Sequence, residues 1–484
     1  MKRAMGVLFV GLAATLVASG CTRTTDDTDD AITPEKLSAA VQQDALIGHL
    51  EKLESIAKDN DGNRSVGSPG YDASVEYVVD RLKEKGFDVQ TPEFDVKKFE
   101  IKSESLKAGD RNFELHTLSY SPATPPAGIT SRLAPVPADD SPGCTASDYD
   151  GIDARGAIAL VPRGICPFVE KQRAAEERGA AAVIIVNNTD GPLGGTLGDE
   201  GVGKIPVASV STADGAALAA LPEVTLSIDA LASEVKTRNI IAQTKTGSTD
   251  NVVMAGAHLD SVPEGPGIND NGTGTAAVLE SALQLGSSPD LPNAVRFAWW
   301  GGEELGLLGS ADYVEKLSDA DRLNIALYLN FDMLGSQNAA YLTYDGDDSD
   351  RQGEGPGPKG SAGIERTFNS FLLQQGITPT GTDFDGRSDY GPFIEKGIPS
   401  GGLFSGAEEK KTPEQVEQWG GTADKAYDEH YHAYSDTLAN INKDAFTKNA
   451  AAVAYSIGLY ANSIGGPNGV PGKPDRPAAR GAEK

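Results

Sequence analysis

The sequence predicts an α/β protein with a mixed, largely parallel sheet sandwiched by helices and a smaller, β-rich domain inserted into it. Three observations lead to this prediction. The chain of 484 residues is too long for one compact core. Beyond residue 236, apolar strands alternate with helical segments, as in parallel α/β sandwiches. Between 109 and 235 the chain is instead rich in Ala, Val, Gly and Pro.

The first 21 residues, "MKRAMGVLFVGLAATLVASGC", have the form of an export signal. Lys2 and Arg3 precede an apolar run and then small residues, a pattern too short to span a bilayer. The letters "ASGC" resemble the bacterial lipobox, in which the cysteine, here Cys21, is acylated; the alternative is an ordinary signal peptide with an incidental cysteine. We therefore expect an exported protein, at the cell surface, in the periplasm or released to the medium, that touches a membrane only through a lipid anchor.

The ends of the mature chain are polar. Residues 22–43 begin "TRTTDDTDD" and are expected to form a disordered tether, and residues 464–484, rich in Gly, Pro and charge, a disordered tail.

The net charge of -28, from 42 basic and 70 acidic side chains, argues against a nucleic-acid partner, because phosphate binding needs clustered Lys and Arg. We expect a monomer.

Only Cys144 and Cys166 remain after the lipobox cysteine. In an exported protein, two remaining thiols most simply form a disulfide, which is our expectation. Two buried free thiols are the alternative.

The catalytic part of the chain is expected over 44–108 and 236–463. Residues 45–58 and 73–86 carry apolar side chains at helical spacing, and 87–101 alternate as a strand does. Strands and helices then resume after "TRNIIAQTKTG".

The stretch 109–235 contains short strands such as "AIALVPRG" and "AAVIIVNN" around the helix "CPFVEKQRAAEERG". This order of a strand, Arg-Gly, a cysteine and Phe, a Lys-bearing helix and "GAAAVIIVNN" resembles the protease-associated domain. The resemblance implies an inserted accessory domain that acts as a lid or screens substrates and has no chemistry of its own.

Histidine and carboxylate side chains stand where the predicted strands end or in the loops beyond: His258, Asp260, Asp270, Glu303, Glu304, Asp332, His430 and His432. Singly, each has an ordinary explanation, such as a structural histidine or an acid-rich helix start. Because they recur at successive strand ends, where function collects in such sheets, we expect one site. Histidines with several carboxylates and no thiolate suit zinc.

Several short stretches, together with the order of these residues, resemble metallopeptidase family twenty-eight, the co-catalytic di-zinc aminopeptidases of secreted bacterial type. They are "GNRSVGSPGYDAS", "HLDSV", "GINDNGTGTAAVLE", "WWGGEELGLLGS", "NFDMLG", "GRSDYGPF" and "YHAYSDT". The resemblance implies a zinc exopeptidase fold, hydrolysis of single N-terminal residues from peptides or proteins, and two zinc ions per chain.

The resemblance also implies the role of each metal-site residue. His258 and Asp332 would hold one zinc ion, Glu304 and His432 the other, and Asp270 would bridge them. Glu303 would be the general base that takes the proton of the attacking water. The peptide bond Asp270–Asn271 would be cis. Adjacent glutamates have diverging side chains, so a loop opened by Gly301 and Gly302 is needed to aim them.

Four further roles are expected around the metals. Asp260 would accept the other ring N–H of His258, and Tyr431 would hydrogen-bond the developing oxyanion. Arg387 would contact the substrate's amino end through its main chain, and an acidic pocket with Glu303 and Asp332 would suit the α-ammonium. His430 is a rival to His432, which keeps the family's spacing. Family members often have a cysteine pair where His430 and Ser435 stand, so no disulfide is expected there.

Three alternatives to an aminopeptidase stay open. The same scaffold supports glutaminyl cyclisation with one zinc ion, carboxypeptidase activity, and non-catalytic binding by relatives that have lost ligands. All five ligands are present here, and no basic pocket for a C-terminal carboxylate is evident. The sequence lacks a G-x-S-x-G nucleophile elbow, and "GTGTAA" does not follow a strand as a dinucleotide loop would. Calcium is possible but not indicated.

Overall fold

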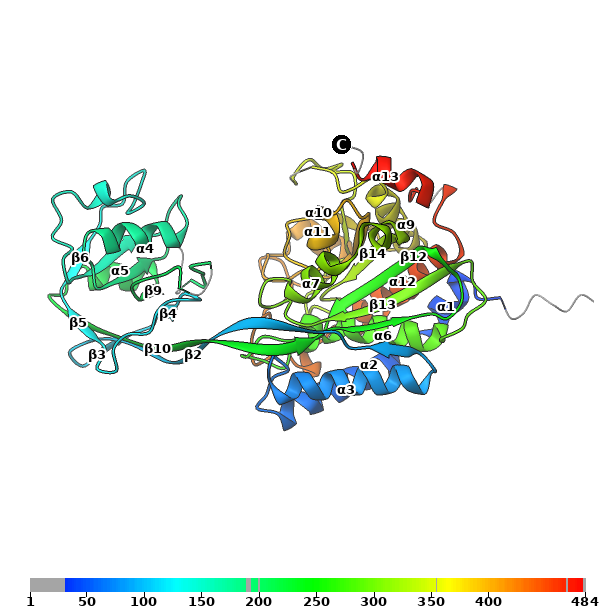
Figure 1. Ribbon diagram of the computed structural model, residues 1–484, viewed down its shortest axis with the longest axis horizontal. Helices are drawn as coiled ribbons and strands as arrows, with labels where there is room; N and C mark the ends of the chain where they lie inside the picture. Colours follow the sequence, from blue (N-terminus) through cyan, green and yellow to red (C-terminus); the bar gives the residue numbers. More distant parts are fainter. Residues whose placement is uncertain (1–30, 189–192, 199–200, 354, 467–468, 482–484) are drawn as a thin grey trace, which may run out of the picture.

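The computed structural model describes residues 31–188, 193–198, 201–353, 355–466 and 469–481. Figure 1 shows a large lobe, a small lobe and a long two-stranded ribbon that joins them. The predicted export signal and Cys21 lie outside the described residues. Among the described residues, no helix has the length and apolar composition needed to cross a membrane.

The large lobe is built on a mixed eight-stranded sheet. Its strands, in spatial order, are β1 (Asp88–Gln90), β11 (Ile240–Gln243), β13 (Asn293–Trp300), β12 (Ser248–His258), β14 (Ile325–Phe331), β17 (Ser400–Phe404), β15 (Leu342–Tyr344) and β16 (Thr380–Thr382). The four central strands from β13 to β17 are mutually parallel. Their carboxyl ends therefore meet at one edge of the sheet.

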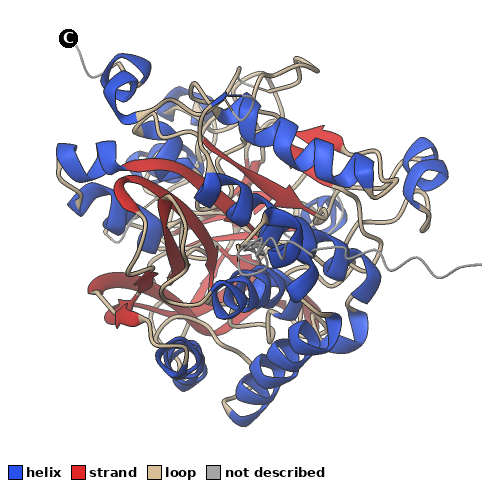
Figure 2. Cartoon of the chain, turned by 90° about the vertical axis from the view of Figure 1, so that its right-hand side faces the viewer, coloured by secondary structure: helices blue, strands red, loops and turns tan. Residues whose placement is uncertain are grey.

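Helices cover both faces of this sheet, as Figure 2 shows. Val253 and Phe297 belong to a core with buried side chains of α6 and α12, whereas Met254 and Ala298, one residue further along each strand, belong to a second core with side chains of α7 and α10. This alternation follows from the two-residue period of a strand. The helices of the large lobe are α1 (Pro34–Ala40), α2 (Gln43–Asp59), α3 (Pro69–Glu84), α6 (Gly274–Leu285), α7 (Leu308–Lys316), α8 (Asp319–Asn324), α9 (Ser361–Gln374), α10 (Gly391–Glu395), α11 (Pro413–Trp419), α12 (Lys443–Asn462) and α13 (Arg476–Ala479).

The small lobe has its own five-stranded sheet and two helices, and Cys144 is disulfide-bonded to Cys166 within it, as predicted. Its elements are β4 (His116–Thr117), β6 (Leu133–Pro135), β7 (Ile158–Pro162), β8 (Ala182–Val186), β9 (Val207–Val210), α4 (Phe168–Glu177) and α5 (Thr212–Leu218). Buried apolar residues on both faces of the sheet form two cores. The α/β architecture with a smaller inserted domain is thus confirmed.

The ribbon consists of β2 (Glu93–Ala108) and β10 (Val224–Arg238), which pair antiparallel from Glu93 opposite Arg238 to Lys107 opposite Thr225. The short strands β3 (Arg111–Phe113) and β5 (Ile129–Ser131) extend it at the small lobe. The strand expected over 87–101 is therefore two strands, β1 and β2, in different sheets. The expected domain limits at 108 and 235 leave all of β2 in the catalytic part and most of β10 in the insert, although the two strands are paired.

Two expectations of disorder are wrong for the described residues. Within the expected tether, α1 packs on α12, and its Leu37 is buried in the main core. Within the expected tail, the buried guanidinium of Arg476 donates hydrogen bonds to the carbonyls of Asp250 and Leu323. Both segments have few apolar residues, so hydropathy alone gave no sign that Leu37 and Val41 in the first, and Val470 and Arg476 in the second, are buried against the large lobe.

Candidate metal centre

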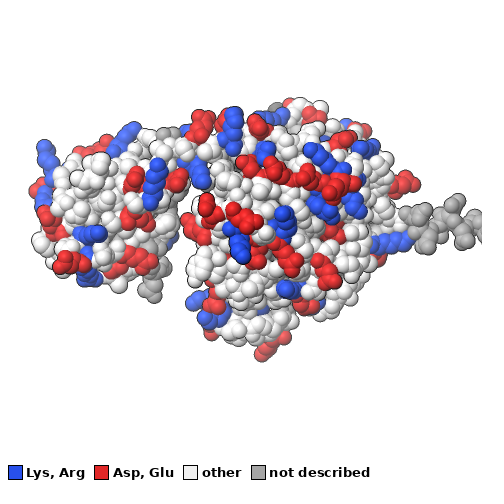
Figure 3. Space-filling view, turned by 90° about the horizontal axis from the view of Figure 1, so that it is seen from below, with Lys and Arg blue, Asp and Glu red and all other residues white. Residues whose placement is uncertain are grey.

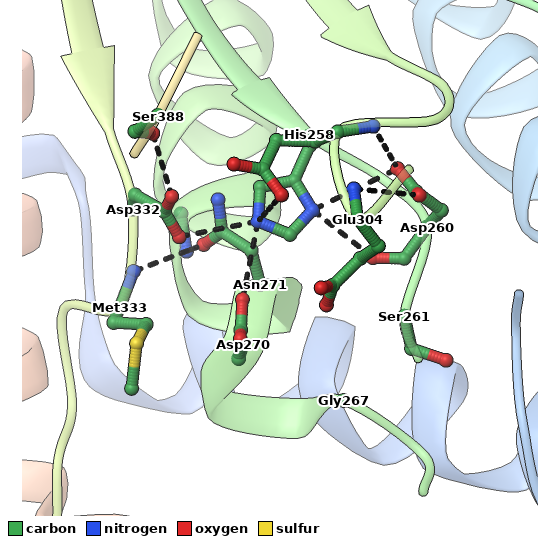
Figure 4. Close-up of polar contacts among 12 residues, drawn as sticks. His258, Asp260, Ser261, Gly267, Asp270, Asn271, Glu304, Asp332, Met333 and Ser388 are labelled. Atoms are coloured by element: carbon green, nitrogen blue, oxygen red, sulfur yellow. Dashed lines mark hydrogen bonds and ion pairs between the residues drawn. The ribbon is translucent and has the colours of Figure 1, made fainter. Parts of the chain in front are cut away.

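Histidine and carboxylate side chains from several strand ends converge at the carboxyl edge of the large sheet (Figure 4). His258 is the last residue of β12 and is only 1% exposed. Glu303 and Glu304 follow β13, Asp332 follows β14, and Asp270 lies in an irregular turn before α6. Parallel strands therefore bring together residues that are far apart in the sequence, as predicted.

Asp270 faces both histidines. Its Oδ1 lies 3.1 Å from Nε2 of His258, and its Oδ2 lies 3.2 Å from Nε2 of His432. Asp332 Oδ1 is 3.2 Å from the same nitrogen of His258, and Glu304 Oε2 is 3.1 Å from that of His432. Each histidine is thus matched with one further carboxylate, and Asp270 is shared between the two pairs.

Negative charge dominates this buried cluster. Burial raises the pKa of Glu303 well above its usual range, and repulsion from Glu304 and Asp332 adds to the effect. Burial and the charge of Asp270 raise the pKa of Glu304 to about 7. Burial by itself lowers the pKa of His258, but Asp332 and Glu303 outweigh it, so the pKa lies well above normal. Such a cluster favours bound cations.

The donor set fits metal ions. Two imidazoles and three carboxylates present nitrogen and oxygen atoms without thiolate, a set that zinc accepts. Oε1 of Glu304 is buried and has no hydrogen-bond partner, which is costly unless an ion contacts it. His258, Glu303 and Asp332, and likewise His258, Asp270 and Glu304, place ligand atoms within 4.8 Å of one another.

The loop after β13 aims the two glutamates. A Cβ on Gly301 would lie 2.2 Å from the hydroxyl of Tyr71, and Gly302 has φ +80°, so both positions require glycine. The carboxylate of Asp260 accepts the backbone N–H groups of Glu303 and Glu304 at 3.3 and 3.4 Å. These bonds fix the turn in which adjacent side chains diverge.

Both the backbone carbonyl and the carboxylate of Asp260 face the ring of His258. Nδ1 of His258 is 3.1 Å from the backbone carbonyl of Asp260, but 3.7 Å from its carboxylate. The side chain of Asp260 also holds the glutamate loop. The expected role of the Asp260 carboxylate at this ring stays a prediction, and the backbone carbonyl of the same residue is a second possible acceptor.

Two further side chains position the cluster and were not singled out from the sequence for this role. Ser388 donates a hydrogen bond of 2.6 Å to Oδ2 of Asp332. The buried carboxylate of Asp436 accepts the backbone N–H groups of Asn269 and Asp270 at 2.7 and 3.0 Å. The signals were available, since Ser388 lies in "GRSDYG" and Asp436 in "YHAYSD". The Asp270–Asn271 peptide bond is cis, as expected.

Tyr431, Arg387 and His432 lie together at the mouth of the cluster, where a cleft of about 490 Å³ opens. A guanidinium N–H of Arg387 lies 3.3 Å from the hydroxyl oxygen of Tyr431, and the same side chain pairs with Glu408 at 2.9 Å. His430 instead has its two ring nitrogens hydrogen-bonded to Ser435 and Gln337. The geometry therefore favours His432 over its rival.

Comparisons with known proteins agree with this geometry. Residues 239–457 match the description Peptidase family M28, and residues 129–218 match the PA domain. The probable lipoprotein aminopeptidase LpqL of Mycobacterium tuberculosis is 53% identical over 483 residues, covering 97% of this chain and 96% of its own. The chain belongs to peptidase family M28. The predicted family and its inserted protease-associated domain, hereafter the PA domain, are thus confirmed.

Other proteins named as aminopeptidases are similar along most of the chain. The aminopeptidase of Pseudomonas aeruginosa is 43% identical over 447 residues, covering 87% of this chain and 82% of its own. Among solved structures, the aminopeptidase from Aneurinibacillus sp. strain AM-1 gives a TM-score of 0.72 at 26% identity, covering 89% of this chain and 96% of that one. BSAP, described as a zinc aminopeptidase from Bacillus subtilis, gives 0.68 at 27% identity, covering 89% and 98%.

Proposed function

We propose that this M28 peptidase is an aminopeptidase that removes single N-terminal residues from peptides with two zinc ions. The observation that carries the proposal is the position of Asp270, whose two oxygens face two different histidines at 3.1 and 3.2 Å. A carboxylate shared in this way suits a bridge between two cations. The names of LpqL, of the P. aeruginosa relative and of the zinc aminopeptidase BSAP support the same activity.

The five proposed ligands divide into two sets around Asp270. We assign His258 and Asp332 to one zinc ion and Glu304 and His432 to the other. When bound, zinc supplies Lewis acidity toward a peptide carbonyl and toward water. Ser388 and Asp260 keep the ligands in orientation through the bonds described above. Calcium is not part of the proposal.

Glu303 is the proposed general base. Its Oε2 lies 4.0 Å from Nε2 of His258, and it lines the cleft but is not shared between the histidines as Asp270 is. A carboxylate that lines the cleft and holds no metal ion itself is free to take a proton from water and to pass it to the leaving amine.

Tyr431 is the proposed donor to the developing oxyanion. Because an N–H of Arg387 is directed at the phenolic oxygen, the O–H of Tyr431 is left to donate elsewhere. The carboxylates of Glu303 and Asp332 in the same cleft would attract the substrate's α-ammonium. We also propose that the main chain at Arg387 meets the amino end of the substrate.

The test is hydrolysis of leucinamide and of leucyl peptides, with N-acetyl peptides as the matched control. We expect release of free leucine only from unblocked substrates, and loss of turnover with a zinc chelator. A peptide with N-terminal glutamine distinguishes an aminopeptidase from a glutaminyl cyclase, because a cyclase would release ammonia without shortening the peptide. Cleavage of acetylated peptides, or chelator-insensitive turnover, would contradict the proposal.

The location and domain limits are also proposed. Residues 1–21 would be a lipoprotein signal peptide with Cys21 acylated, in keeping with the name of LpqL. We expect an exported monomer on a lipid anchor, with residues 109–235 as the insert and the ribbon shared by both lobes. Labelling with a fatty-acid analogue, lost in Cys21→Ala, tests the anchor, and sedimentation of the mature chain tests the monomer.

A further inference from the structure

The loop that carries the two glutamates separates two hollows of the protein surface. Gly306 and Leu307 line the cleft over the metal centre, whereas Leu305 and Leu308 line a second hollow of about 590 Å³. Glu304 lines both. Glu304 is therefore a shared wall between the second hollow and the cleft over the metal centre.

The ribbon and the PA domain form the other wall of this second hollow. Val96 and Phe99 come from β2, and Tyr120 comes from the segment that follows β4 in the small lobe. Val96 packs with Leu305 and Leu308, so the base of the ribbon is fixed to the glutamate loop. Figure 3 shows a notch between the two lobes.

Tyr120 is held in an uncommon backbone conformation. Its φ of 63° lies in the left-handed region, which a bulky residue rarely adopts. Its ring lies 5.7 Å from that of Phe99, and its hydroxyl donates to the carbonyl of Lys97 at 3.2 Å. Strain of this kind persists only where its surroundings enforce it, and it is concentrated at ligand-binding sites.

We propose that this second hollow binds the side chains of a peptide substrate just beyond the scissile bond. The cleft over the metals is also lined by Leu342, Thr380 and Phe404 of three strands, and we assign it to the terminal residue of the substrate. The remaining peptide then leaves past Glu304 into the second hollow. Because Phe99, Tyr120 and the two leucines offer half-buried apolar surface there, the PA domain confers a preference for an apolar, above all aromatic, residue at this position.

This inference rests on the proposed aminopeptidase function, and its test compares Leu-Phe-Gly with Leu-Gly-Gly. In the unaltered protein we expect kcat/KM to be about tenfold higher for Leu-Phe-Gly, because only phenylalanine buries apolar surface in the hollow. Phe99→Ala and Tyr120→Ala should each reduce this ratio to about threefold or less. Leu231→Ala is the control, since Leu231 is 51% exposed, pairs with Glu100 in the same ribbon and lies outside the hollow.

A ratio near one in the unaltered protein, or an unchanged ratio in both variants, would overturn the inference. So would an equal loss on both peptides, which is what general damage to the fold would cause. If neither peptide is cleaved, the proposed function fails instead. In that case, calorimetry with the dipeptides Phe-Gly and Gly-Gly still tests whether the second hollow binds an aromatic side chain. Tighter binding of Phe-Gly that is lost in Phe99→Ala would support this inference. Equal binding of the two dipeptides would contradict it.

Discussion

The molecule contains two sheets with parallel strands, and among the described residues the cluster of possible metal ligands lies at the edge of the large one. In the large lobe, the ends of β12, β13 and β14 lead into His258, Glu303 and Asp332, all largely buried. In the PA domain, the corresponding ends of β7 and β8 lead into residues such as Arg163 and Asn187, whose side chains bond to each other at 3.1 Å. A parallel sheet edge thus provides a place for a site but not its chemistry.

The two lobes also differ in whether their buried charged side chains have hydrogen-bond partners. Lys171 of the PA domain is fully buried and donates to the carbonyl of Pro142, so its needs are met within the protein. In the large lobe, an oxygen of Glu304 has no partner, and several carboxylates repel one another. Within the described parts of the chain, every group of three possible metal ligands lies in the large lobe. Buried carboxylates that repel one another, and not parallel strands alone, distinguish this edge of the large sheet.

The two lobes should differ most strongly in their response to metal removal. We expect chelation and dialysis to lower leucinamide turnover by more than about 10³-fold, because Lewis acidity contributes several kcal/mol to such reactions. Added zinc should restore the turnover. The PA domain should keep its fold, which protease resistance of the insert measures. Unfolding of both lobes on chelation would contradict the separation.

Within the large lobe, substitutions of Glu303 and Glu304 should have different effects on turnover and zinc content. Glu303→Gln keeps every proposed ligand but loses the proton acceptor, so kcat should fall by about 10² to 10⁴-fold while zinc content stays near that of the unaltered protein. Glu304→Gln should lose zinc and recover part of its activity when zinc is in excess. Metal analysis beside turnover checks both, and a Glu303→Gln protein with near-normal kcat would refute the assignment.

A smaller effect is expected at the hydrogen bond that orients Asp332. Ser388→Ala removes a 2.6 Å bond to the second oxygen of that carboxylate, so zinc affinity or kcat should fall by about 10 to 100-fold. Ser281→Ala is the matched control, because Ser281 is equally buried but bonds to the carbonyl of Ala277. Equal behaviour of the two variants would show that the bond to Asp332 has no such role.

The smallest effect on turnover should come from the PA domain's disulfide. Replacing Cys144 and Cys166 by serine opens a loop with a sequence separation of 22, which the chain-entropy model values at about 3 kcal/mol of stability. Thermal unfolding of the small lobe should therefore move to lower temperature, while leucinamide turnover stays within about twofold. A large loss of turnover would mean that the two lobes are more tightly coupled than the comparison implies.

The sequence was sufficient for the architecture and for which residues converge. Alternating apolar strands and helices predicted the sheet, and parallel strands necessarily bring their ends together, so the meeting of His258, Asp270 and Asp332 followed from the order of elements. The disulfide was expected from two remaining cysteines in an exported chain. The roles of the converging histidines and carboxylates as metal ligands and general base remain proposals.

The features of the structure that the sequence did not predict depend on the position of single atoms or on tertiary contacts of a few side chains. The backbone carbonyl of Asp260 lies nearer to Nδ1 of His258 than its carboxylate does, and this is set by side-chain rotation, which spacing does not encode. The helices α1 and α13 are short and polar, and burial of Leu37 and Arg476 fixes them by tertiary contacts that local propensity does not report. The hollow beside Tyr120 arises only when the ribbon brings the PA domain and the glutamate loop together.

The central claim is that Asp270 bridges two zinc ions, and anomalous diffraction at the zinc edge from crystals of the zinc-loaded protein tests it most directly. We predict two peaks of anomalous density, one beside each oxygen of Asp270, with His258 and Asp332 nearest the first and Glu304 and His432 nearest the second. A single fully occupied peak, or two peaks that do not share Asp270, would contradict the account.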